Sequence, residues 1–260
     1  MRWSGLRLSV TLLTAVPLRG ASPEPRRATV AAAMTWAPAV GLLLGVTAAA
    51  VLVVADHLLG VGPLTAAGLA VATLALLTRG LHLDGLADLA DGLGSGKPAP
   101  VALDIMRRSD IGPFGTVTLV LTLLIQVAAL AQAEAAGGGR GPAALITAVV
   151  TGRLALTWAC RRGVAAARRE GLGALVAGTV RPAAAAVITL AVLAAACLVI
   201  IDEPRGWMLP LAVVAGLIGA LVLQRHAVRR LGGITGDVLG ALIEVATTVT
   251  LVVAAMSPRA

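Results

Sequence analysis

The sequence predicts an all-α polytopic membrane protein with about seven transmembrane helices and an N-terminal helix at the membrane interface. Hydrophobic residues make up 58% of the 260 residues, whereas soluble domains have about 45–50%. The mean hydropathy is +0.93. The apolar residues form separate runs close to the ~20 residues that a spanning helix needs. A water-soluble fold could not bury this much apolar surface, so we expect lipid to be the solvent.

Seven apolar runs are predicted to span the bilayer, and glycine or proline marks many of their ends. The stretch before Pro17 is short and is interrupted by Arg7, so we expect a retained interfacial or half-membrane helix and not a cleaved signal peptide. Residues 1–260 are expected to form a single integral-membrane domain. The predicted spans are 36–55, 62–78, 114–133, 142–160, 183–201, 207–223 and 238–256.

Basic residues concentrate in every second connection between these runs. The basic connections are 17–35, 79–113, 161–181 and 224–237, and the others hold few arginines or lysines. By the positive-inside rule, these four segments face the cytoplasm and the C-terminus lies outside. We therefore expect a multi-pass protein of the cell inner membrane, with its polar motifs on the cytoplasmic side.

The net charge of +8 is explained by this topology. The arginines are largely confined to connections, and no platform of interleaved aromatic and basic residues exists, so nucleic acid is not an expected partner. Cys160 and Cys197 lie in apolar runs without a CxxC pair, which indicates structural thiols. The sequence leaves the oligomeric state open.

An acidic motif follows the second run, in residues 79–94 (RGLHLDGLADLADGLG). On a helix, Asp84, Asp88 and Asp91 are spaced i, i+4, i+7 and share one face. Three like charges repel unless a cation lies between them, and carboxylate oxygens suit Mg²⁺, which also binds substrate phosphates. Ionisable groups near lipid are costly and usually functional, so we prefer a metal site to a solvated helix face. His82 could be a base, a phosphate donor or a packed core imidazole.

A basic motif occupies residues 105–115 (IMRRSDIGPFG). Arg107, Arg108 and Ser109 precede a Gly-Pro-Phe-Gly turn into the third span. Arginine forks match phosphate oxygens, so we expect phosphate binding here. A topology anchor alone would explain both arginines, but not the Asp, Ser and Gly residues around them.

A glycine-rich motif occupies residues 232–241 (GGITGDVLGA). Glycine backbone can approach an anion closely, and its amides can cradle the anion. The alternative is a small-residue surface for helix packing. We interpret four residues of this turn as phosphate-binding: Gly232, Gly233, Thr235 and Gly236.

Three further charged residues bear on the site. Asp237 and Glu244 are seven residues apart and share a helical face, with Glu244 about two turns inside a predicted span. Arg153 lies inside the fourth span, where an arginine needs a partner or a cavity, and the acids are its natural partners. We count Arg153 among the phosphate-binding groups. Since phosphoryl transfer depends mainly on positioning and charge neutralisation, these pieces indicate a membrane-embedded transferase acting on a diphosphate.

The three motifs resemble the signature of the cobalamin synthase family, the adenosylcobinamide-GDP ribazoletransferases. The resemblance runs from about Leu12 to the last span. It implies a late step of cobalamin assembly, in which adenosylcobinamide-GDP is joined to α-ribazole or its 5′-phosphate and GMP is released, with Mg²⁺. It further implies that Asp84, Asp88 and Asp91 hold the metal. It gives catalytic roles to Asp84, Asp88 and Asp237, and His82 is our choice of base.

Two positions depart from the family pattern. The family usually reads Arg-Asp-Ser where this chain reads Arg107-Arg108-Ser109-Asp110, so that acid and base have exchanged places. Leu89 replaces a small polar residue of the acidic motif. The first departure affects the separate roles of Arg108 and Asp110.

Two other functions compete with this interpretation. A CDP-alcohol phosphotransferase also uses clustered aspartates at the membrane surface, but its Asp-Gly-x-x-Ala-Arg spacing is not present after Asp84. A cation-coupled transporter would spread its acids across the bilayer and carry paired repeats. Here most acids gather on one predicted side, which favours an enzyme.

Overall fold

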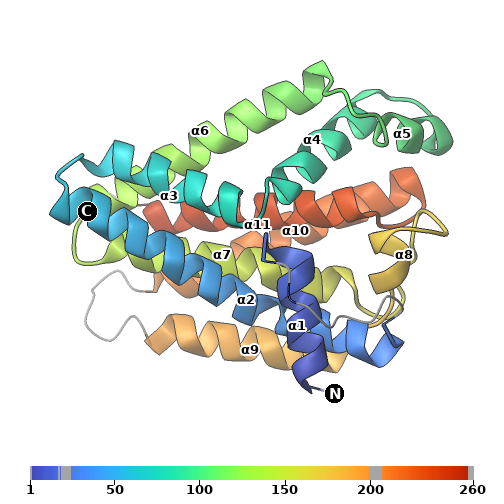
Figure 1. The fold of residues 1–260 in the computed structure, drawn as a ribbon, viewed down its shortest axis with the longest axis horizontal. Coiled ribbons are helices and arrows are strands. Elements are labelled where there is room, and N and C mark those ends of the chain that lie inside the picture. The colour runs from blue at the N-terminus through green and yellow to red at the C-terminus, as the bar shows by residue number, and fades with distance from the viewer. Residues whose placement is uncertain (1, 17, 19–24, 199–206, 257–260) are drawn as a thin grey trace.

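The structure is a computed structural model that describes residues 2–16, 18, 25–198 and 207–256. Long helices lie side by side in a bundle, and helix α1 crosses helix α2 (Figure 1). The described part of the chain contains no strand, only two isolated bridges. The helices are α1 Arg2–Leu13, α2 Arg27–Val53, π-helix η1 Val54–Leu58, α3 Pro63–Leu77, α4 Leu81–Gly94, α5 Ala99–Ile105, α6 Pro113–Ala135, α7 Arg140–Ala159, α8 Leu172–Val176, α9 Pro182–Leu198, α10 Met208–Leu231 and α11 Gly236–Ala255.

The all-α polytopic fold is confirmed, and each predicted span coincides with a helix. Five helices are long and apolar enough to cross a membrane: α2 with η1, α6, α7, α10 and α11. Helices α3 and α4 pass that test only as a pair, bent by 88°. The predicted spans 62–78 and 183–201 correspond to α3 and α9, of 15 and 17 residues. Five or six spans therefore meet the length criterion, against about seven predicted, and residues 199–201 lie outside the described part.

Helix α7 lies at the centre of the bundle because small residues let its neighbours approach closely. A Cβ at Gly41 of α2 would lie 2.9 Å from the Val149 carbonyl oxygen. A Cβ at Gly152 of α7 would lie 3.0 Å from the Ile243 carbonyl oxygen. Such close contacts are typical of helices packed in membranes. They bring α2, α7 and α11 into one core that extends to the acidic motif.

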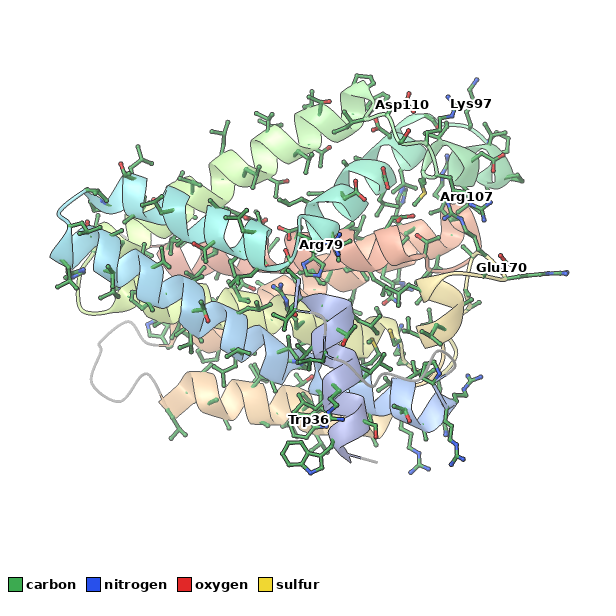
Figure 2. The ribbon with its side chains drawn as sticks, viewed as in Figure 1. Trp36, Arg79, Lys97, Arg107, Asp110 and Glu170 are labelled. Atoms are coloured by element: carbon green, nitrogen blue, oxygen red, sulfur yellow. The ribbon has the colours of Figure 1, made fainter. Side chains whose placement is uncertain are left out.

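The break between α3 and α4 positions that motif. Arg79 has φ 55° and is the one non-glycine residue with positive φ among those described, and Gly80 follows with φ 67°. Two successive left-handed residues end α3, at a cost of roughly 1–2 kcal/mol for Arg79. Helix α4 therefore leaves α3 at 88° and lies against α11. Figure 2 shows Arg79 near the middle of the bundle, and Lys97 and Arg107 at its right-hand end.

Candidate active site

Helices α4 and α11 cross with no side chain between them. A Cβ at Gly85 would lie 2.9 Å from the Cα and carbonyl oxygen of Asp237, and a Cβ at Gly240 would lie 3.1 Å from the carbonyl oxygen of His82. Gly85 is therefore the residue that lets α11 approach α4. The crossing brings together three carboxylates that we call the acidic cluster: Asp84 and Asp88 from α4 and Asp237 from α11.

The acidic cluster carries more negative charge than its surroundings neutralise. Asp84 and Asp88 lie on α4, which is not one of the five helices that are long and apolar enough to cross a membrane alone. Burial, and then the charges of Asp84, Asp237 and Asp91, raise the pKa of Asp88 to about 7, while Arg168 acts in the opposite direction. Carboxylates that repel each other in this way are a suitable donor set for a divalent cation.

Arg168 is the arginine that the structure places beside the acidic cluster. Its Nη1 lies 3.8 Å from Asp237 Oδ2, its Nη2 donates to the Leu103 carbonyl at 2.6 Å, and its Nε is buried without a partner among the described residues. Arg168 is not predicted from the sequence, because a topology signal already accounts for the five arginines of residues 161–181. Nothing in the local sequence distinguishes Arg168 from Arg169, which is exposed.

The glycine-rich turn is held by contacts within the protein. Gly232 ends α10 with φ 83°. A Cβ at Gly233 would overlap the backbone of Ala166 and Ala167, since Ile234 exchanges backbone hydrogen bonds of 2.9 and 3.0 Å with Ala165 and Ala167. These bonds align the segment before Arg168 with the start of α11. The left-handed backbone therefore accounts for Gly232 and close packing for Gly233, and phosphate binding by this turn stays a prediction.

Thr235 and Gly236 form the start of α11. Thr235 Oγ1 accepts a hydrogen bond from Val238 N at 3.2 Å, which caps the helix, and Thr235 donates to Asp237 Oδ2 at 3.1 Å. Asp237 Oδ2 therefore accepts the hydrogen bond of the Thr235 hydroxyl and also faces Arg168. Gly236 lines the cavity described next.

A cavity of about 170 Å³, which we call the main cavity, lies beside the acidic cluster. Its polar wall consists of His82, Asp84 and Asp237, and the rest is mainly leucine and other apolar side chains. The apolar wall comes from helices α1, α2, α4, α7, α8 and α11: Leu12, Leu13, Met34, Leu81, Leu156, Leu172, Leu239 and Ile243. The site thus combines a charged end with a mainly apolar wall.

His82 is 5% exposed and is held by Arg153. Arg153 Nη2 lies 3.4 Å from His82 Nδ1. A guanidinium only donates hydrogen bonds, so Nδ1 is the acceptor and the neutral ring carries its proton on Nε2. Nε2 is buried without a partner among the described residues. This geometry favours a hydrogen-bond donor, one of the three roles left open for His82, over the base.

Arg153 lies behind His82, not in the main cavity. It is 3% exposed and lines a second, much smaller cavity together with Gln126 and Glu244. Gln126 Nε2 donates to Glu244 Oε2 at 2.9 Å. The predicted acid neighbour of Arg153 is therefore Glu244, and Arg153 reaches the main cavity only through His82.

Asp91 makes a different set of bonds from the other two acids of α4. It is 9% exposed, and its two oxygens accept hydrogen bonds from Gly112 N at 2.7 Å and Gly115 N at 2.9 Å. These bonds fix the start of α6, where backbone amides need acceptors. Within the described ranges, neither Asp91 nor Asp237 completes a group with Asp84 and Asp88 whose ligand atoms all lie within 4.8 Å. The assignment of a metal to Asp84, Asp88 and Asp91 stays a prediction.

Arg107, Arg108 and Ser109 lie in the connection between α5 and α6. All three are exposed. Figure 2 shows Arg107 at the edge of the bundle. Their side chains make no hydrogen bond or ion pair with the described residues of the acidic cluster. The contact between arginine and the acidic cluster comes instead from Arg168.

The fold and the site together define a polytopic α-helical membrane protein with an acidic site at one end of the bundle. The chain belongs to the cobalamin-5-phosphate synthase family, whose sequence profile matches residues 5–255. This membership confirms the resemblance read from the three motifs. It favours neither the CDP-alcohol phosphotransferase nor the transporter.

Curated relatives match over nearly their whole length. An adenosylcobinamide-GDP ribazoletransferase of Frankia casuarinae is 45% identical, covering 96% of this chain and 94% of the relative. Relatives of the same name from Nocardioides sp. and Bradyrhizobium diazoefficiens are 40% and 37% identical, covering 94% and 96% of this chain and 95% and 92% of the relatives. No solved structure matches the chain.

Proposed function

We propose that this chain is an adenosylcobinamide-GDP ribazoletransferase, with residues 1–260 acting as one transferase domain. It joins adenosylcobinamide-GDP to α-ribazole or its 5′-phosphate and releases GMP. The names of the relatives and their coverage support the reaction. The observation that best supports it is the acidic cluster of Asp84, Asp88 and Asp237 beside a cavity that His82 lines, with Arg168 3.8 Å from Asp237.

The acidic cluster fits Mg²⁺ as its cofactor. All donors are carboxylate oxygens, which Mg²⁺ prefers. The burial and mutual repulsion that act on Asp88 favour a bound cation. Asp84 and Asp88 would hold the ion, with Asp237 beside them free to accept a proton, because Asp91 is bonded to the backbone of α6. When bound, Mg²⁺ neutralises charge on the diphosphate and on departing GMP.

The protein's own groups orient the diphosphate for transfer. The Arg168 guanidinium, beside Asp237, binds phosphate oxygens. The Nε2–H of His82, whose ring is held in place by Arg153, donates a hydrogen bond to another phosphate oxygen. The apolar wall of the main cavity excludes water, so that hydrolysis does not compete with transfer.

In the transfer step, a ribazole hydroxyl oxygen bonds to the phosphorus that carries cobinamide. The bond from that phosphorus to the bridging oxygen breaks, and GMP leaves with this oxygen. Asp237 accepts the hydroxyl proton at Oδ1, because Oδ2 already receives Thr235 and faces Arg168. The product is the ribazole ester of the cobinamide phosphate.

The site is proposed to face the cytoplasm, where nucleotides are found. The basic segments support this orientation, since Lys97 and Arg107 lie at the same end of the bundle as α4 (Figure 2). The orientation is measured by labelling the cysteine of a Ser109→Cys variant from each side of sealed vesicles, since Ser109 is exposed. Labelling from the periplasmic side alone would contradict it.

The test of the reaction uses the purified full chain in detergent. We expect GMP release with adenosylcobinamide-GDP, α-ribazole and Mg²⁺, and loss of release after EDTA that excess Mg²⁺ restores. No GMP from protein shown to be folded by thermal unfolding would overturn the proposal. GMP release that EDTA does not change would contradict the Mg²⁺ assignment alone.

A further inference from the structure

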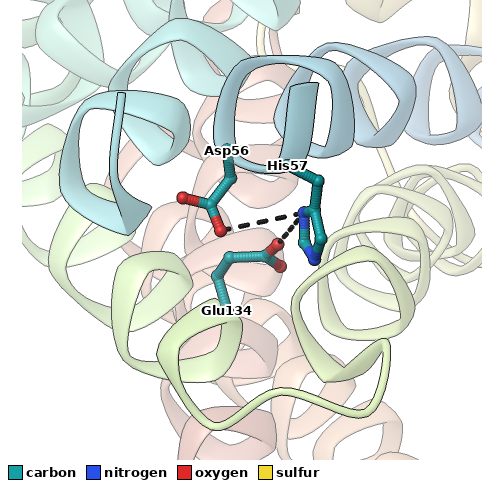
Figure 3. Close-up of side chains that lie close together, drawn as sticks. All are labelled: Asp56, His57 and Glu134. Carbon is teal, nitrogen blue, oxygen red and sulfur yellow. Dashed lines mark ion pairs between the residues drawn. The ribbon is translucent and has the colours of Figure 1, made fainter. Parts of the chain in front are cut away.

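A second group of potential ligands lies at the opposite end of the bundle. Asp56 and His57 of η1 and Glu134 of α6 point toward one another (Figure 3). We call them the η1–α6 trio. His57 Nδ1 lies 3.5 Å from Glu134 Oε1 and 3.8 Å from Asp56 Oδ2. One ligand atom from each residue lies within 4.8 Å of the others.

Local structure brings the three side chains together. Adjacent residues of an ordinary α-helix do not face each other, but Asp56 and His57 lie in the five-residue π-helix η1 and both reach Glu134. Glu134 lies in the last turn of α6, with its Oε2 against Gly141 of α7, where any larger residue would displace it. The trio therefore connects the end of α2 to the end of α6.

Glu134 is the residue that points to a ligand. Its side chain is only 3% exposed, and its ion-pair partner among the described residues is His57. A buried carboxylate is unfavourable unless a positive charge is nearby. The nearest group is His57 at 3.5 Å, whose side chain is 63% exposed. A cation held between the three residues would satisfy the buried carboxylate from the solvent side.

The distances fit a small ion with imidazole and carboxylate ligands. Zinc bonds of about 2.0–2.1 Å in a tetrahedron separate the ligand atoms by about 3.3 Å. The separations of 3.5 and 3.8 Å exceed that value by about 0.2 and 0.5 Å, so small side-chain shifts would bring the ligand atoms into place. An imidazole ligand favours Zn²⁺ over Mg²⁺, which prefers oxygen ligands throughout.

We propose that Asp56, His57 and Glu134 form a Zn²⁺ site. Each supplies one ligand atom, and water completes the coordination on the exposed side of His57. The ion joins η1 to α6 at the end of the bundle away from the acidic cluster, and it stabilises the folded chain in proportion to its occupancy. The site is independent of the transferase reaction.

The test measures bound metal in the purified full chain in detergent, prepared with a tag that contains no histidine. The chain is stripped with chelator, incubated with Zn²⁺ in a large excess of Mg²⁺ to occupy the acidic cluster, and desalted. We expect one Zn²⁺ per chain by elemental analysis, and a rise in the unfolding temperature that is absent with Mg²⁺ alone. Co²⁺ in place of Zn²⁺ should give visible absorption of a site with nitrogen and oxygen ligands.

His57→Ala and Glu134→Gln should each lose the bound Zn²⁺ and the rise in unfolding temperature. His226→Ala is the matched control, since His226 is an exposed histidine of α10 and should leave both unchanged. His57 is mostly exposed, so its replacement tests ligation without loss of packing. No Zn²⁺ on the unmodified chain, or equal Zn²⁺ on His57→Ala, would overturn the proposal. Neither readout involves GMP, so this test is distinct from the test of the transferase.

Discussion

The two halves of α4 carry the same kinds of residue and use them differently. In the first half, Asp84 and Asp88 face Asp237, which lies 3.8 Å from an arginine, beside a cavity. In the second half, Asp91 gives both oxygens to backbone amides of α6. The arginines that follow, Arg107 and Arg108, are exposed.

Spacing along a helix identifies which residues share a face, but not which partners that face meets. Asp91 shares the face of Asp84 and Asp88, but α6 begins next to it and takes up its carboxylate. Arg168 is about 80 residues away from α4 in sequence, and two backbone bonds to Ile234 align its segment with the acids. Four predictions test whether the two halves differ in function as they do in structure.

The largest effect is expected from the first half. Asp84→Asn and Asp88→Asn should each lower GMP release by more than about 100-fold, since even groups outside the first metal shell contribute 10–100-fold. The exposed Asp104→Asn is the control and should retain activity. Unfolding temperatures near that of the unmodified chain would show that folding is intact. Full activity in either variant would contradict the metal assignment.

The second-largest effect is expected at Arg168 and distinguishes it from the exposed arginines Arg169 and Arg108. Arg168→Gln should lower kcat/KM by about 10–100-fold, because a hydrogen bond to a charged group contributes about 1.5–3 kcal/mol. Exposed Arg169→Gln and Arg108→Gln should change it less than about fivefold. Steady-state kinetics of GMP release measure all three. A larger loss at Arg108 than at Arg168 would return phosphate binding to the connection between α5 and α6.

A third prediction concerns stability in the second half. Asp91→Asn keeps one acceptor but places an amide donor against a backbone N–H, so the free energy of unfolding should fall by about 1.5–3 kcal/mol. Thermal unfolding in detergent measures the loss, with exposed Asp110→Asn as the control. Activity per folded molecule should fall less than in Asp84→Asn. The reverse order would make Asp91 a metal ligand after all.

The smallest effect on GMP release is expected from Glu244, which shares the small cavity with Arg153 and His82. Glu244→Gln preserves an acceptor for Gln126 but removes the charge that shares a small cavity with Arg153. We expect GMP release to fall by less than about tenfold, because neither residue lines the main cavity. An unchanged rate would limit Glu244 to packing.

Much of the site could be predicted because its residues are unusual for their surroundings. Asp84 and Asp88 stand out as acids beside apolar runs, and Asp237 follows a glycine-rich turn. The functions of Gly85, Gly233 and Arg168 could not be predicted, because each depends on a segment distant in sequence. The trio of Asp56, His57 and Glu134 was also missed, since two of its members adjoin one apolar run and the third ends another.

The membrane environment, the helices and the family follow from the sequence alone, because apolar runs and local motifs are properties of contiguous residues. Which carboxylates meet depends on how the helices pack. The left-handed pair Arg79 and Gly80 turns α4 by 88°, and Gly85 lets α11 approach until Asp237 stands beside it. A carboxylate's role depends on what lies within a few ångströms, and in this chain those neighbours come from other helices.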